Sequence, residues 1–406
     1  MGLQPYAKLL TFAIESQLIT NLPTYNLLVI MNNRYHFLDN LRWATVLLVV
    51  FYHVFYNYNS LGVFGAIGGF ADHQWQDIFC TLLNPWFMTL LFVVAGASSR
   101  YALQRRTSTG FRRERTRKLL VPSTIGLVVF GGVLGWLNMT IAGAQIPENI
   151  PPFAKWLIAV ASGTGPLWFI QDLYVFSLLL LLVRRVVDAD SVDRWITGLP
   201  QWGVGLVMVA FGVLLYVASQ SQIDNPTAAQ GLFNLYRPVF YFVGFLCGYY
   251  IFSSERVHHF LAERAEVLIV AAVVSAVAFC TEFYGKDYTS PVAVQSLWCN
   301  LYCWAMTLAM IGSFRRWANT TSPVADYMSR SSFGVYIVHM TVCTAACWWL
   351  KTSGLPLWAI YSLALTITFA GSFALWEILH RLPLLRWCIF GIKKKNRPTT
   401  SICRGV

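Results

Sequence analysis

The chain has 406 residues, of which 56% are hydrophobic and only 12% are charged. An ordinary soluble domain carries about 25% charged residues, so this composition excludes a soluble globular protein and predicts an all-α, polytopic integral membrane protein. The net charge of +12 would suit nucleic acid. We expect no nucleic-acid partner, however, because the basic residues gather in a few segments between apolar runs.

About ten apolar segments approach the length of a membrane-spanning helix, which needs about 20 residues. We predict spans at residues 41–59, 80–103, 119–139, 166–183, 201–219, 234–252, 265–283, 293–313, 333–350 and 357–378. Lysine and arginine concentrate in alternate loops, which leaves only Lys155, Lys286 and Lys351 in the other loops and Arg237 inside a span. By the positive-inside rule, this pattern predicts that both termini are cytoplasmic.

The spans define one transmembrane domain at residues 35–392, flanked by an N-terminal extension at 1–34 and a basic cytoplasmic tail at 393–406. The extension is moderately apolar but contains Glu15 and Pro23, and no basic region precedes its apolar part. These features do not match a cleavable signal peptide. The extension is compatible with a segment on the membrane surface, or with one that has little function.

Cysteine and histidine residues do not form a recognisable metal motif. The nine cysteines include no CxxC pair, and several have helical spacing inside apolar runs, so we expect neither a disulfide framework nor a metal site. His258 and His259 lie in a charged loop without further ligands.

The first span contains one ionisable side chain, His53, and begins at Arg42. Eleven residues separate them, almost three helical turns, so they share one face about 16 Å apart along the axis. Asp39 lies near the same face. An ionisable side chain inside a membrane is costly and suggests a functional site. The structural alternative is a histidine that is bonded to a neighbouring helix.

The segment Arg105–Lys118 has the densest positive charge in the chain. Such a loop is typical of the cytoplasmic side of membrane proteins. Clustered arginines also suit phosphate groups, because each guanidinium offers a planar fork of donors. The two interpretations are compatible.

Two further segments place polar side chains within spans. Trp168 and Asp172 open the fourth span, and Tyr336 lies one turn before His339 in the ninth. These four residues are candidates for substrate binding. The alternatives are an aromatic anchor at the membrane interface for Trp168 and a helix-stabilising contact for Asp172.

Over residues 35–392 these segments resemble the membrane-bound acyltransferase family 3, which includes O-antigen and peptidoglycan O-acetylases and the glucan biosynthesis protein C group. The most specific element is the family's Arg-x10-His signature, met by Arg42 and His53. Similar segments are Asn84–Gly96, Pro166–Ile170, Phe333–His339 and Glu377–Lys393. The family's Arg-x-x-Arg motif corresponds by distance from Pro122 to Arg115 and Lys118, whereas Arg112 and Arg115 match it literally one turn earlier.

The resemblance implies a bacterial inner-membrane enzyme that transfers an acyl group from cytoplasmic acyl-CoA to a hydroxyl of an envelope glycan or glycolipid. The donor would be a substrate rather than a permanently bound cofactor; acetyl is the family default and succinyl the alternative. His53 would act as general base or transient acyl carrier. Arg42 and the basic loop would bind the CoA phosphates, and Asp39 could orient Arg42.

Two other functions remain open. Intramembrane Asp172, Arg237, His53 and His339 would suit a transporter of a glycan or acylated small molecule, although the sequence shows no internal repeat of the kind that many transporters carry. A sensor or assembly partner with a degenerate site is the third, and the intact Arg-x10-His signature argues against it.

Overall fold

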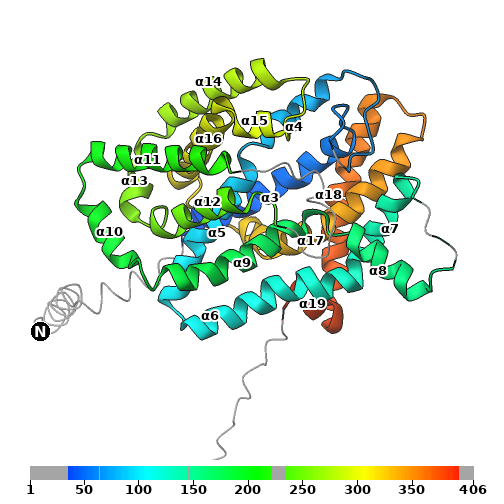
Figure 1. Cartoon of the computed structure of the whole chain (residues 1–406), viewed down its shortest axis with the longest axis horizontal. Coiled ribbons are helices and arrows are strands. Elements are labelled where there is room, and N and C mark those ends of the chain that lie inside the picture. The colour runs from blue at the N-terminus through cyan, green and yellow to red at the C-terminus, as the bar shows by residue number, and fades with distance from the viewer. Residues whose placement is uncertain (1–34, 64, 145–146, 148, 222–234, 393–406) are drawn as a thin grey trace, which may run out of the picture. The chain divides into compact units, whose positions relative to one another are not determined.

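The computed structural model describes residues 35–392 apart from 64, 145–146, 148 and 222–234. The predicted extension at 1–34 and tail from 393 lie outside the described residues. The described residues from Phe37 onward belong to one unit, which contains nearly all of the residues of the membrane-spanning helices. All regular structure within the described residues is helical, which confirms the all-α prediction (Figure 1).

Nine stretches of the described chain are long and apolar enough to cross a membrane, and each coincides with a predicted span. They are built from α3 (His36–Asn57), η1 (Trp75–Asp77), α4 (Ile78–Leu83), α5 (Phe87–Gln104), α6 (Ser108–Arg115), η2 (Thr116–Leu120), η3 (Pro122–Gly131), α7 (Gly132–Ile141), η4 (Gly165–Leu167), α9 (Trp168–Val183), α11 (Gln201–Ser219), α14 (Ala265–Phe283), α16 (Leu297–Trp317), α17 (Pro323–Lys351) and α18 (Leu357–Arg381). Shorter helices are α8 (Pro152–Ser162), α10 (Ala189–Gly198), α12 (Pro238–Tyr250), α13 (Glu255–Glu263), α15 (Pro291–Gln295) and α19 (Pro383–Phe390).

The predicted span at 234–252 is the exception, because α12 has only 13 residues and is too short by itself to cross a bilayer. Its start is determined locally. Pro238 occupies the first turn, where its missing N–H costs nothing. Arg237 before it has a left-handed backbone with φ 46° and ψ 50°, so α12 cannot extend through this residue.

The basic segment before the third span is a helix rather than the expected loop. Thr107 caps α6 by accepting a hydrogen bond from the Gly110 N–H at 3.2 Å. Glu114 forms ion pairs with Arg106 and with Lys118, the latter at 2.8 Å across one turn. The helix then continues through the π-helical turns η2 and η3 into α7, so the basic residues project from a defined helical surface.

The α5–α12 contact is a close approach of two backbones, made through glycines. A Cβ atom on Gly248 would lie 2.0 Å from the Val93 carbonyl oxygen, and one on Gly96 would lie 2.0 Å from the Phe245 carbonyl oxygen. Small residues let helices in membranes pack this closely. The short helix α12 is thereby held against a long membrane-spanning neighbour.

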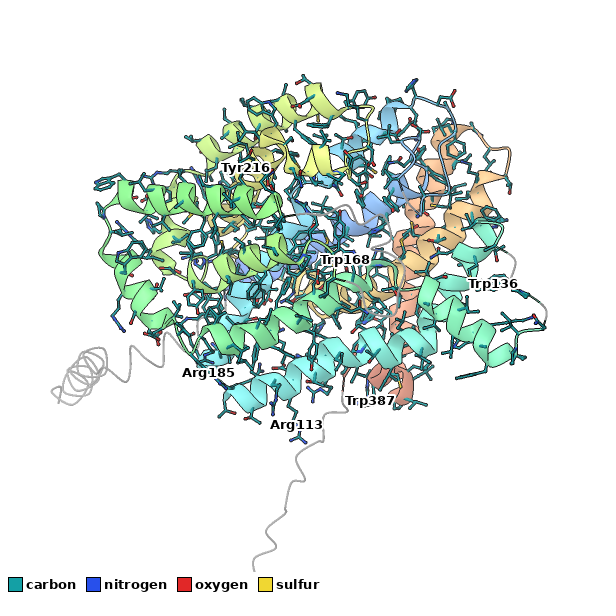
Figure 2. All side chains as sticks on the ribbon, viewed as in Figure 1. Arg113, Trp136, Trp168, Arg185, Tyr216 and Trp387 are labelled. Atoms are coloured by element: carbon teal, nitrogen blue, oxygen red, sulfur yellow. The ribbon has the colours of Figure 1, made fainter. Side chains whose placement is uncertain are left out.

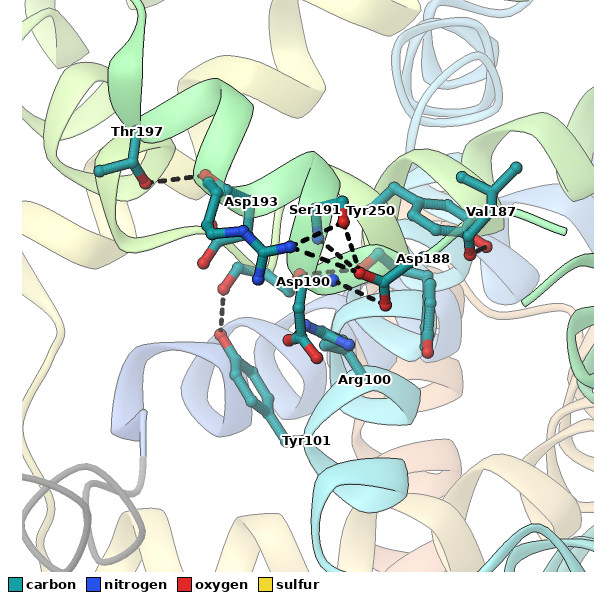
Figure 3. Close-up of polar contacts among 12 residues, drawn as sticks. Arg100, Tyr101, Val187, Asp188, Asp190, Ser191, Asp193, Thr197 and Tyr250 are labelled. Atoms are coloured by element: carbon teal, nitrogen blue, oxygen red, sulfur yellow. Dashed lines mark hydrogen bonds and ion pairs between the residues drawn. The ribbon is translucent and has the colours of Figure 1, made fainter. Parts of the chain in front are cut away.

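Loops predicted to lie on the same side of the membrane contact one another. On the predicted cytoplasmic side, Arg100 pairs with Asp190, Tyr101 donates to the Ser253 carbonyl at 3.1 Å, and Tyr250 donates to the Val187 carbonyl at 3.1 Å (Figure 3).

At the other end, three hydrogen bonds join the opposite set of loops: Lys351 to the Gly69 carbonyl at 2.7 Å, Gln74 to the Tyr361 hydroxyl at 3.3 Å, and Gln220 to the Gln295 carbonyl at 2.9 Å. Helix α12 ends at Tyr250 on the first side, whereas Tyr236 just before it packs against Trp168 at the start of α9.

Helices α3 and α17 run side by side in the same direction. Three side-chain contacts occur in the same order along both helices: Arg42 with Ser329, His53 with His339, and Asn57 with Cys343. Tyr58, the residue after α3, continues the order by donating to the Cys347 carbonyl. This register brings the two intramembrane histidines together.

Replacing Gly248 with leucine is expected to destabilise the protein, because the larger side chain would push α12 away from α5. Overpacking a core typically costs about 1–3 kcal/mol of stability. Each kcal/mol lowers the melting temperature of a large domain by roughly 2–4 °C. Samples in detergent are heated, and size-exclusion chromatography then gives the temperature at which half of the monodisperse protein is lost. Gly198→Leu is the control, since nothing lies within 4 Å of a Cβ there. Equal melting of the two variants would contradict the close α5–α12 contact.

Candidate active site

The centre of the candidate site is the contact between His53 on α3 and His339 on α17. His339 Nε2 lies 3.2 Å from His53 Nδ1, and the ring centroids are 4.9 Å apart. His339 is completely buried, whereas His53 is partly exposed. His53 is therefore the member of the pair that a substrate can reach.

Backbone carbonyls determine how the two rings carry their protons. His53 Nδ1 lies 2.7 Å from the Val49 carbonyl, and His339 Nδ1 lies 2.6 Å from the Tyr336 carbonyl. A carbonyl oxygen only accepts, so both Nδ1 atoms are assigned as protonated. His339 Nε2 then shares the His53 Nδ1–H with Val49, and in the neutral ring His53 Nε2 keeps its lone pair. No described residue forms a hydrogen bond to that atom.

Arg42 lies at the start of α3, about 16 Å from His53 by helical rise. Its Nη2 atom donates to Asp39 Oδ1 at 2.8 Å and to Ser329 Oγ of α17 at 3.1 Å. The Asp39 carboxylate and the Ser329 hydroxyl thus hold the Arg42 guanidinium between them.

The predicted basic residues of α6 and η2 face in different directions. Arg115 donates to Ser99 Oγ on α5 at 2.9 Å and is close enough to Arg42 for their positive charges to repel each other. Arg112 is exposed, and Lys118 is exposed and paired with Glu114. The structure therefore brings Arg115 toward Arg42 but leaves Arg112 and Lys118 on the outer surface, where Arg113 also projects (Figure 2).

Trp168, Asp172 and Tyr336 form a second group beside the histidines. The Tyr336 ring is 5.6 Å from His339, and its hydroxyl donates to the Pro166 carbonyl at 2.5 Å. Asp172 is fully buried on α9, and the Phe169 ring of the same helix lies 5.5 Å from the Tyr336 ring. Trp168 lies among the central helices at the start of α9 (Figure 2). All four candidates for substrate binding thus lie in one region.

Comparison with known families identifies the chain. A family model described as an acyltransferase domain matches residues 35–377. The chain belongs to acyltransferase family 3. Comparison with curated proteins and with solved structures gave no significant match. The match covers every residue of the candidate site, from Asp39 to His339.

Some site residues of this acyltransferase were not predicted from the sequence. Ser329 and Ser99 are ordinary helical serines, and nothing in their local sequence indicates that they hold arginines. Arg237 had a signal, because a lone charge inside a predicted span suggests a functional position. Within the described part of this acyltransferase, no group of three histidine, cysteine or acidic side chains is placed to hold a metal.

The tautomer assignment can be measured by solid-state NMR on the acyltransferase labelled with ¹⁵N-histidine in lipid. At neutral pH we expect the His53 signals to show a protonated Nδ1 and an unprotonated Nε2. His53→Gln and His339→Gln identify the two sets of signals, and His259→Gln, an exposed position on α13, should leave both unchanged. An unprotonated His53 Nδ1 would overturn the assignment.

Proposed function

We propose that this acyltransferase moves an acyl group from cytoplasmic acyl-CoA to a hydroxyl of a bacterial cell-envelope glycan or glycolipid. The observation that carries the proposal is the arrangement of His53, with an open Nε2, about three helical turns from the basic Arg42–Arg115 group. The acyl group proposed is acetyl, the family default. Succinyl is kept as the alternative, because no residue of the site selects between the two.

The basic group suits the phosphates of CoA. Arg42 and Arg115 come from different helices, and a serine hydroxyl rather than an acid holds the Arg115 guanidinium, so its positive charge remains available to an anion. The positive-inside pattern supports the proposal that this end faces the cytoplasm, with both termini on that side. An extended pantetheine arm could then bring its thioester toward His53.

The proposed reaction uses His53 as general base. Its Nε2 takes the proton of the acceptor hydroxyl while the hydroxyl oxygen attacks the thioester carbonyl carbon. The carbon–sulfur bond breaks, and the CoA thiolate leaves and receives the proton from the imidazolium. Transfer through an acyl-His53 intermediate uses the same atom as nucleophile. His339 positions the ring by accepting from Nδ1–H.

The first test measures transfer of labelled acyl groups from acetyl-CoA and succinyl-CoA to a supplied envelope glycan in membranes that contain the protein. His53→Gln is expected to lower transfer by about 10²–10⁴-fold, the usual contribution of a general base. His259→Gln, at matched expression, is the control. Normal transfer by His53→Gln would refute the catalytic assignment, and glycan movement across the membrane without thioester consumption would favour a transporter.

The second test concerns the donor site. Arg115→Gln is expected to weaken CoA binding by about tenfold or more, because hydrogen bonds to charged groups contribute about 1.5–3 kcal/mol. Binding of pantetheine, which has no phosphate, should change little.

Arg113→Gln on the outer surface of α6 is the control for the second test. Isothermal titration calorimetry of the purified protein in nanodiscs gives the dissociation constants of CoA and pantetheine. Equal loss of CoA and pantetheine binding in Arg115→Gln would show that Arg115 supports the fold rather than binding phosphate.

A further inference from the structure

Asp172 and Arg237 are buried ionisable residues, and several of their polar atoms lack hydrogen-bond partners. Asp172 is 0% exposed, and neither carboxylate oxygen accepts a hydrogen bond within the described chain. The main chain at Tyr236 approaches this carboxylate without forming a bond of ordinary geometry. Arg237 is 9% exposed, and its Nε and Nη2 atoms also have no described partner. Such groups are normally paired in native structures.

The two residues belong to one small region. Tyr236, which approaches Asp172, directly precedes Arg237 in the chain, and the Arg237 guanidinium lies 5.7 Å from the centroid of the Tyr241 ring. Trp168, one turn before Asp172 on α9, packs against both tyrosines. No ion pair joins Asp172 to Arg237, although pairing would be the simplest way to reduce the cost of burying both charges. The unbonded carboxyl and guanidinium atoms therefore remain available to a third group.

The backbone at Arg237 is strained. It is the only non-glycine residue with positive φ in the described chain, and such conformations in non-glycine residues often occur at functional sites. Its guanidinium lies 4.1 Å from the centroid of the Phe240 ring, which orients it without using its hydrogen-bond donors. The start of α12 thus presents an oriented cation with unused donors.

Aromatic rings complete the region and connect it to the histidines. Trp168 packs against Tyr236 at 5.1 Å and Tyr241 at 5.5 Å between ring centroids, and both Trp168 and Tyr236 are partly exposed. The Phe169 ring contacts Trp168 and lies 5.5 Å from the Tyr336 ring, and the Tyr336 ring lies 5.6 Å from His339, the partner of His53. A continuous set of rings therefore leads from Asp172 and Arg237 to the proposed base.

We propose that Asp172 and Arg237 are the hydrogen-bonding groups of the acceptor site and that they bind the hydroxyls of a polyhydroxylated six-membered ring. Hydroxyls can donate to the carboxyl oxygens and accept from the guanidinium, so one such ring can satisfy both groups. The apolar C–H face of the ring lies against Trp168 and Tyr236. Because Asp172 is closed to solvent, the Trp168 or Tyr236 side chain moves aside on binding. This inference rests on the proposed function.

Saturation-transfer-difference NMR on the full chain in nanodiscs tests the site without requiring turnover. The probes are the methyl glycosides of glucose, galactose, mannose and N-acetylglucosamine, with cyclohexanol as a ring that has a single hydroxyl. We expect at least one glycoside to bind the wild type and cyclohexanol to compete poorly. Asp172→Asn and Arg237→Gln should each weaken glycoside binding by about tenfold or more, because each removes a charged hydrogen-bonding group.

Matched controls are Glu282→Gln and Lys286→Gln, which change the same charges at exposed positions near the end of α14. Monodispersity of every variant shows that the fold is retained. Absence of glycoside binding to the wild type, or equal binding by the wild type and both site variants, overturns the proposal. If Trp168→Leu also loses glycoside binding, this would support the contact between the C–H face of the sugar ring and Trp168.

The acyl-transfer assay separates this inference from the proposed function. Glycoside binding that depends on Asp172 and Arg237, without acyl transfer from any donor, would retain the site and refute the proposed reaction. Acyl transfer by the wild type, with glycoside binding that the two substitutions do not change, would retain the reaction and refute the site.

Discussion

The parallel packing of α3 against α17 is the contact on which the whole candidate site depends. It pairs Arg42 with Ser329 at one end and His53 with His339 about three turns further along. Each helix alone presents only a polar side chain on an apolar surface. Together they place the two rings in contact, so that His339 accepts from the His53 Nδ1–H and orients the ring, while Ser329 holds Arg42.

The short helix α12 shows how the remaining packing supports polar groups that are costly to bury. Glycine contacts bring its backbone against α5, and its late start leaves non-helical backbone at Tyr236 and Arg237. Irregular backbone at membrane depth is tolerated where protein surrounds it. The unpaired Arg237 and Asp172 lower the stability of the unliganded protein. The tight packing of α5 and α12 offsets part of that cost.

The features that were best predicted from the sequence are those that a single helix determines by itself. Nine spans follow from length and hydropathy, and the shared face of Arg42 and His53 follows from helical geometry. The tenth predicted span, 234–252, is represented only by the 13-residue helix α12, because Pro238 and the left-handed Arg237 begin that helix late, and apolar composition does not report that start. Contacts between helices, such as Ser99 with Arg115, depend on tertiary packing, so the sequence alone could not show them.

The unbroken helix α3 between Arg42 and His53 limits which sequence changes this chain can accept during evolution. One residue added to or removed from that stretch would rotate everything beyond it by about 100°, since an α-helix has about 3.6 residues per turn. His53 would then turn away from His339 even if every other side chain were kept. Substitutions between the two residues are therefore far more tolerable than insertions or deletions, so this segment is constrained more strictly in length than in composition.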